Sequence, residues 1–143
     1  MRAEMLRLCR LDAFGGTAGR LARRPPRLAI RRASRRPRSR LGFAVPSEWR
    51  LSVTDYPGIR PGDAQETLLH ELVHLHLGPP RGRRRWHGRE FKETLHAAMR
   101  EAYGVLGVRS AGAYHGAYAD QLERIRNARV HPQQLDLDLR DAA

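Results

Sequence analysis

The chain has 143 residues, enough for one domain with its own hydrophobic core. Its 27 basic residues stand against 15 acidic ones, for a net charge of +12, and ten arginines lie within residues 20–40. No stretch of about 18 consecutive apolar residues occurs, so a membrane span is not expected. The single cysteine, Cys9, excludes a disulfide within the chain and a zinc ribbon built from cysteines.

The first third of the chain predicts one helix and three strands. Apolar and charged side chains are interspersed over residues 2–14, which favours a short amphipathic helix ended by Gly15-Gly16. The same charges interrupt any signal-peptide core, so a cytoplasmic location is expected. Segments 27–31, 41–45 and 49–54 are predicted strands, and their short spacing favours an antiparallel meander with its arginines toward solvent.

A longer helix is predicted over residues 63–77. Asp63 and Glu66 have the spacing of a capping box at its start, and Gly78 suits a left-handed residue at its end. Leucines and a valine recur through this segment at helical intervals. The helix is therefore expected to be buried on two sides.

This helix carries the sequence H-E-L-V-H, which fits the pattern H-E-x-x-H of metalloproteases. His70 and His74 are four residues apart and share one helix face, so both imidazoles can bind a single metal ion. Zinc lowers the pKa of a bound water, and a nearby carboxylate takes its proton during attack on a carbonyl. The pattern predicts a zinc site with Glu71 as general base.

A catalytic zinc usually takes three protein ligands, so the sequence must supply one more. His87 is predicted to open a second helix that Gly104 ends, and it shares the buried face of that helix with Phe91. His76 lies about 240° around the first helix from His70 and is expected to point away from the metal. Three carboxylates remain as alternative ligands: Glu90, Glu93 and Glu101.

These elements predict an α+β fold, with a small three-stranded antiparallel sheet packed on helices. A single domain is expected over residues 1–129, followed by a loose tail over 130–143. Within the domain we expect a basic part (1–50), the two catalytic helices (63–104) and a last helix (111–129).

The pairing of two motifs extends the interpretation to a known family. H-E-L-V-H, an arginine-rich loop and then H-G-R-E-F at residues 87–91 resemble the SprT-like zinc metalloproteases, a family related to the Spartan-type DNA–protein crosslink proteases. The resemblance covers roughly residues 20–104. It is to a minimal form of the family, without the cysteine zinc ribbon. It implies a zincin-like fold, Zn²⁺ held by His70, His74 and His87, Glu71 as the catalytic base, and a protein or peptide substrate.

Arginine clusters suggest a second kind of partner. Eight residues are predicted to contact nucleic acid, through phosphates or by stacking on a base: Arg31, Arg32, Arg35, Arg36, Arg83, Arg84, Arg85 and Trp86. The alternative is a genome bias toward arginine, because Lys92 is the only lysine in the chain.

The leading prediction is a zinc-dependent metallopeptidase, with DNA-associated proteins as one substrate class. Two alternatives stay open: a nucleic-acid-binding module in which zinc is structural, and a regulatory protein with a degenerate protease fold. The sequence leaves the oligomeric state, the cleavage preference and the oxyanion-stabilising residue undecided.

Overall fold

A computed structural model of the chain describes residues 1–83 and 85–104. The last predicted helix (111–129), the predicted tail (130–143) and Arg84 lie outside these residues. No helix in the described part is long and apolar enough to cross a membrane. The elements follow in this order: α1 (Arg2–Leu8), η1 (Asp12–Phe14), η2 (Gly16–Ala18), α2 (Arg20–Arg23), β1 (Arg27–Arg32), β2 (Gly42–Val45), η3 (Pro46–Glu48), β3 (Arg50–Asp55), α3 (Pro61–Leu77) and α4 (Arg89–Tyr103).

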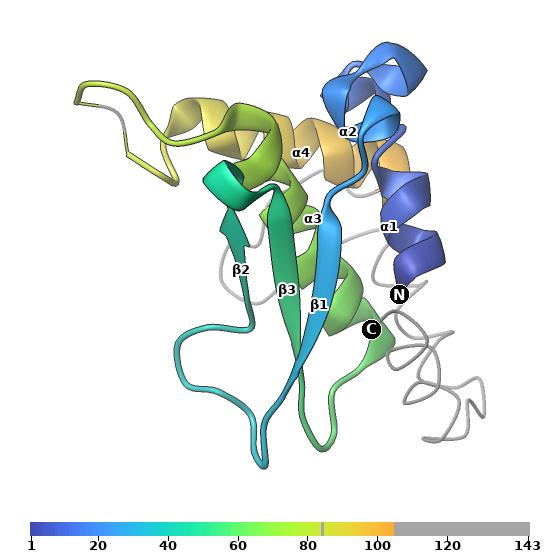
Figure 1. The fold of residues 1–143 in the computed structure, drawn as a ribbon, viewed down its shortest axis with the longest axis vertical. Helices are drawn as coiled ribbons and strands as arrows, with labels where there is room; N and C mark the ends of the chain where they lie inside the picture. The colour runs from blue at the N-terminus through green and yellow to red at the C-terminus, as the bar shows by residue number, and fades with distance from the viewer. Residues whose placement is uncertain (84, 105–143) are drawn as a thin grey trace.

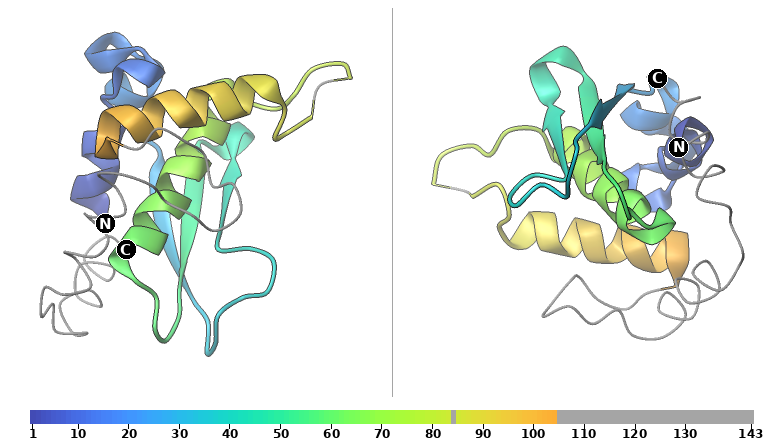
Figure 2. Two further views of the ribbon diagram at one scale, coloured as in Figure 1. Left: turned by 180° about the vertical axis from the view of Figure 1, so that it is seen from behind. Right: turned by 90° about the horizontal axis from the view of Figure 1, so that it is seen from below.

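Helix α3 is the centre of the described fold. It lies between the three-stranded sheet and α4, as the view from below shows (Figure 2, right), and α1 lies on the β1 side of the molecule (Figure 1). Side chains on different faces of α3 are therefore fully buried, among them Leu68, Leu69, Leu72 and Val73. This confirms the expectation that the helix is buried on two sides, and it fixes the backbone that carries H-E-L-V-H.

The sheet is mixed, so the predicted antiparallel meander was wrong. The strand order is β1-β3-β2, with β1 parallel to β3 and β2 antiparallel to β3. Each strand begins and ends within one residue of its predicted bounds. The short η3 turn joins β2 and β3 into a hairpin, whereas the nine-residue connection 33–41 carries the chain past β3 to the far edge. Strand β3 has four successive buried residues and takes the central position.

Helix α3 starts earlier than the capping box predicted. It begins at Pro61 after the extended N-cap Arg60, and no side chain caps its first turn. Proline suits this position because its missing N–H would have no partner there and its φ is already helical. The Asp63 carboxylate accepts a hydrogen bond from Arg60 Nε at 2.9 Å. The predicted end is confirmed, since the Gly78 N–H donates to the His74 carbonyl and Gly78 has a φ of 70°.

The N-terminal helix is shorter than the predicted span 2–14. Helix α1 ends after seven residues, and Leu11 is extended, with φ −61° and ψ 143°. This break allows the 3-10 turn η1 to meet the end of α4. There the Glu101 carboxylate accepts hydrogen bonds from the backbone N–H groups of Asp12 and Ala13, at 2.7 and 3.1 Å. The contact between Asp12 and Glu101, which are 89 residues apart in sequence, thus overrides the local helical pattern.

Candidate metal centre and cleft

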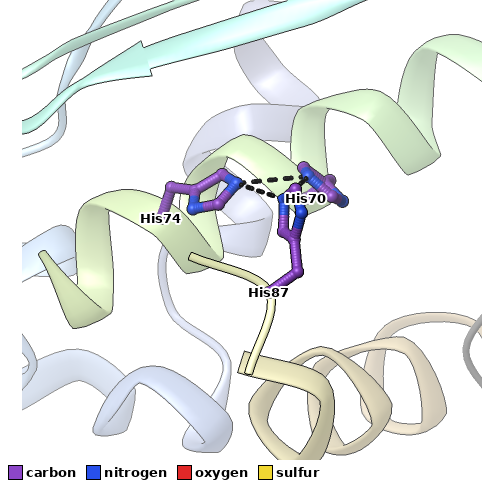
Figure 3. Close-up of side chains that lie close together, drawn as sticks. All are labelled: His70, His74 and His87. Atoms are coloured by element: carbon purple, nitrogen blue, oxygen red, sulfur yellow. Dashed lines mark hydrogen bonds between the residues drawn. The ribbon is translucent and has the colours of Figure 1, made fainter. Parts of the chain in front are cut away.

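Two of the predicted ligands lie one turn apart on α3. The Nε2 atoms of His70 and His74 are 3.2 Å apart, and both side chains are partly exposed on the same face (Figure 3). The spacing follows from helix geometry alone, because residues i and i+4 project in nearly the same direction. The local sequence therefore places these two imidazoles without help from other elements.

His87 completes the group from a different position than predicted. It is exposed and lies in the turn before α4, which begins at Arg89, so it neither opens the helix nor shares its buried face. Its Nε2 atom is 3.2 Å from that of His70 and 3.1 Å from that of His74. Phe91 does lie on the buried face of α4, and its ring contacts all three imidazoles at centroid distances of 4.5–4.8 Å. The phenylalanine thus forms an apolar support under the three rings.

The distances within this group fit a metal ion. A tetrahedral zinc about 2.0–2.1 Å from each nitrogen would hold the nitrogens about 3.3 Å apart. Hydrogen bonds alone do not satisfy the triangle, because each Nε2 atom offers either one proton or one lone pair. Burial, together with the charges of His70 and His87, lowers the pKa of His74 to about 3, so its ring is neutral, as metal binding requires.

The group holds three ligands among the described residues: no fourth His, Cys, Asp or Glu side chain of residues 1–83 and 85–104 joins it. Structural zinc sites are usually closed by four protein ligands, whereas catalytic sites leave one position for water or substrate. The described part of the site is of the open kind.

Glu71 is a buried carboxylate beside this group. Its residue is only 6% exposed, and burial raises its pKa to about 7, while the positive charge of Arg40 opposes that rise. Strand β2 passes closely over it: a Cβ atom at Gly42 would lie 3.1 Å from Glu71 Cγ and 2.6 Å from the Ser52 carbonyl oxygen. The sequence did not single out Gly42, because nothing local indicates that a strand must pass so near α3.

The alternative ligands lie elsewhere. Glu93 faces solvent, and its carboxylate accepts a hydrogen bond from Arg89 Nε at 2.6 Å. Glu101 is occupied with the backbone of η1. Glu90 is exposed and outside the group of three histidines. The ring of His76 packs against Phe14 at 5.2 Å, consistent with the expectation that it points away from the metal.

The three histidines open onto a cleft of about 1020 Å³. One wall is the end of the β1–β2 connection together with β2 itself, an edge strand of the sheet; the other includes Trp86 and His87. The residues that line it are Arg36, Pro37, Arg38, Ser39, Arg40, Leu41, Gly42, Phe43, Ala44, Glu66, Thr67, His70, Glu71, His74, Trp86 and His87. The cleft thus runs along a strand edge past Glu71 and the candidate metal ligands.

The residues predicted to contact nucleic acid are divided between two loops and a strand end. Arg31 lies near the ring of Phe43, 5.4 Å away, and Arg36 lines the cleft. Trp86 is 49% exposed, with its ring edge-on to His74 at 5.6 Å. Four further arginines are exposed, namely Arg32, Arg35, Arg83 and Arg85. Both loops project on the β2 side of the sheet (Figure 1), and of these residues only Arg36 and Trp86 line the cleft among the described residues.

Fold and site together define an α+β protein in which three histidines that could hold a metal ion lie with a buried glutamate at an open cleft. The SprT-like family model matches residues 13–111, well over half of the chain, and the chain belongs to the SprT-like family. Comparisons with curated proteins and with solved structures gave no match.

Proposed function

We propose that this protein is a zinc-dependent metallopeptidase that hydrolyses peptide bonds in a zincin-like cleft. The observation that carries the proposal is the convergence of three Nε2 atoms at 3.1–3.2 Å beside the buried Glu71. Membership of the SprT-like family supports it. The donor set also fits zinc, because imidazole nitrogen is a common ligand of zinc.

Each residue then has a chemical role. Zn²⁺ held by His70, His74 and His87 would polarise the scissile carbonyl and lower the pKa of a water molecule. Glu71 accepts the proton of the attacking water at its carboxylate and passes it to the leaving amine. Burial suits Glu71 to this exchange, because it raises the pKa of the carboxyl toward neutrality.

The edge strand β2 supplies a means of holding substrate. Within the described residues β2 pairs only with β3, so its outer edge offers backbone N–H and C=O groups to an extended peptide. Strand addition binds the peptide backbone without requiring a particular side chain. The bound backbone passes Gly42, next to Glu71.

The two alternative functions receive less support. A closed structural zinc needs a fourth protein ligand, which the described residues do not supply. A regulatory protein with a degenerate protease fold would not require Glu71 to be retained beside the three histidines. Contact with DNA-associated proteins remains part of the proposal, supported by exposed arginines and Trp86 at the cleft.

The test compares the wild-type protein with Glu71→Gln. Bound zinc is measured by elemental analysis, and cleavage of an unfolded protein is measured with and without single-stranded DNA. We expect equal zinc in both proteins and a loss of activity in the variant of about 10²–10⁴-fold, the usual contribution of a general base. A fully zinc-loaded wild type that cleaves nothing under either condition contradicts the proposal.

A further inference from the structure

The cleft wall opposite His87 carries three arginines, Arg36, Arg38 and Arg40, and all three are exposed. The carboxylates that line the same cleft, Glu66 and Glu71, are only 8% and 6% exposed. The charge that an incoming substrate meets is therefore positive. This feature is separate from the metal-binding group, since none of the arginines is a metal ligand.

These arginines differ from others in the described part of the chain. Arg7, Arg60 and Arg89 each form an ion pair with a carboxylate three or four residues away. No carboxylate of the described residues lies within ion-pair distance of Arg36, Arg38 or Arg40. The charge of Arg40 acts on Glu71 without an ion pair between them. Unpaired guanidinium groups at a cleft wall are free to bind an anion in solution.

The position of the arginines along the chain fixes where they meet a bound peptide. They lie two to six residues before Gly42, the point at which β2 passes Glu71. An extended chain rises about 3.3 Å per residue, so all three lie within about 20 Å of Gly42. A peptide that pairs antiparallel with β2, the slightly more stable arrangement, runs from Val45 toward Leu41. Its residues after the scissile bond then pass the arginines.

We propose that Arg36 and Arg38 select substrates with acidic side chains on the C-terminal side of the cleaved bond. The proposal rests on the peptidase function proposed above and names its substrate class. Carboxylate groups bind arginine through paired hydrogen bonds, and the interaction is screened by salt because the cleft is open to solvent. Arg40 is left out of the test, since its charge acts on Glu71 and its removal would affect every substrate.

The experiment uses three peptides that are identical except at the second to fourth positions after the scissile bond, where they carry Asp, Asn or Lys. At low salt we expect kcat/KM for the Asp peptide to exceed that for the Asn peptide by about 3- to 10-fold, since exposed pairs each contribute up to about a factor of five. The Lys peptide should have the lowest kcat/KM. In 0.5 M salt, where the screening length is on the order of 4 Å, the differences in kcat/KM among the three peptides should become smaller.

The variant Arg36→Gln/Arg38→Gln should bring the Asp-to-Asn ratio close to one. The matched control Arg32→Gln/Arg35→Gln removes the same charge from exposed positions that do not line the cleft, and should keep the ratio. Equal cleavage of the three peptides by wild type, or an unchanged ratio in Arg36→Gln/Arg38→Gln, overturns the proposal.

A binding measurement separates this proposal from the peptidase function. Fluorescence anisotropy with Glu71→Gln should show tighter binding of the Asp peptide, lost when Arg36 and Arg38 are also replaced. That result without any wild-type cleavage would retain the acidic-peptide site and reject the peptidase. Equal binding of all peptides, with displacement by a single-stranded oligonucleotide, would assign the arginines to nucleic acid and overturn the proposal.

Discussion

The two ends of the α3–α4 pair use polar side chains in opposite ways. At the metal end, defined by His70, His74 and His87, three ring nitrogens converge at 3.1–3.2 Å, and they cannot all form hydrogen bonds with one another at the same time. At the latch end, defined by Glu4, Arg7, Gln65 and Tyr103, several donors converge on one carboxylate, while Gln65 Oε1 is buried without a hydrogen-bond partner among the described residues. The Glu4 carboxylate there accepts from Arg7 at 2.8 and 2.9 Å, from Tyr103 at 2.7 Å and from Gln65 at 3.3 Å.

The α3–α4 pair therefore carries a candidate metal site at one end and a stabilising hydrogen-bond cluster at the other. A carboxylate with several donors is held in place and has little capacity left for a ligand. Converging lone pairs repel one another and are stabilised by a cation. Changes at the metal end should therefore alter metal binding more than the stability of the metal-free protein, and changes at the latch end should do the reverse.

The largest expected effect is at the metal end. His87→Ala removes one of three proposed ligands and should weaken zinc binding by at least about 100-fold, because even outer-shell partners of a metal site contribute 10- to 100-fold. Zinc affinity is measured by competition with a chromogenic chelator. Glu93→Ala is the matched control, since Glu93 is exposed on α4 and its carboxylate pairs with Arg89. Retained zinc in His87→Ala, or zinc lost in Glu93→Ala, would reject His87 as a ligand.

Gly42→Ala should affect both activity and stability. The added Cβ would lie 2.6 Å from a backbone oxygen of Ser52 and 2.7 Å from Thr67 Cγ2, so β2 must shift away from Glu71. We expect a loss of about 1–3 kcal/mol in the free energy of unfolding and a fall in kcat on the order of 10- to 100-fold. Ala44→Gly is the control on the same face of β2. If it lowers kcat as strongly as Gly42→Ala does, the effect is not specific to Gly42.

Glu101→Ala tests the hydrogen bonds that the end of α4 makes with η1. The carboxylate accepts from two backbone N–H groups, much as a helix cap does, so its loss should lower the free energy of unfolding by about 0.5–2 kcal/mol. Urea unfolding of the metal-free protein measures this, with Glu93→Ala as an exposed control on the same helix. Zinc affinity should stay unchanged; a marked fall would show that the two ends are coupled.

The smallest effect concerns the pH dependence of stability at the latch end. Burial alone would raise the pKa of Glu4, but hydrogen bonds from Arg7 and Tyr103 and the charge of Arg7 outweigh it and lower the pKa below 4.5. The stabilisation is thus present above about pH 4.5 and is lost as the pH falls through the lower, folded-state pKa.

The measurement is the difference in unfolding free energy between wild type and Glu4→Gln, both free of metal, from pH 7 to pH 3. We expect the advantage of wild type, about 1 kcal/mol at pH 7 for a partly buried carboxylate with charged and neutral donors, to shrink at pH 3. Tyr103→Phe should reduce the pH-dependent part by removing one donor. A difference that stays constant over this range would mean that Glu4 is not held as a carboxylate by its donors.

Local sequence determined much of the fold and two of the three histidines of the metal group. The three strands and the ends of α3 and α4 at Gly78 and Gly104 follow from strand patterns and glycine termini. The pair His70 and His74 follows from helical spacing, because four residues make just over one turn. The helix starts were less predictable: α3 begins at a proline rather than at Asp63, and His87 precedes α4 rather than opening it.

Only the tertiary structure decided the remaining parts. The order β1-β3-β2 depends on which strand buries best at the centre, and this is a property of the whole packed fold rather than of a segment. The approach of His87 to α3 depends on the path of a loop and on the position of Phe91 beneath it. The composition likewise shows that the chain is rich in arginine, but it does not predict which arginines line the cleft. That choice follows from the nine-residue connection that brings β2 to the edge beside Glu71.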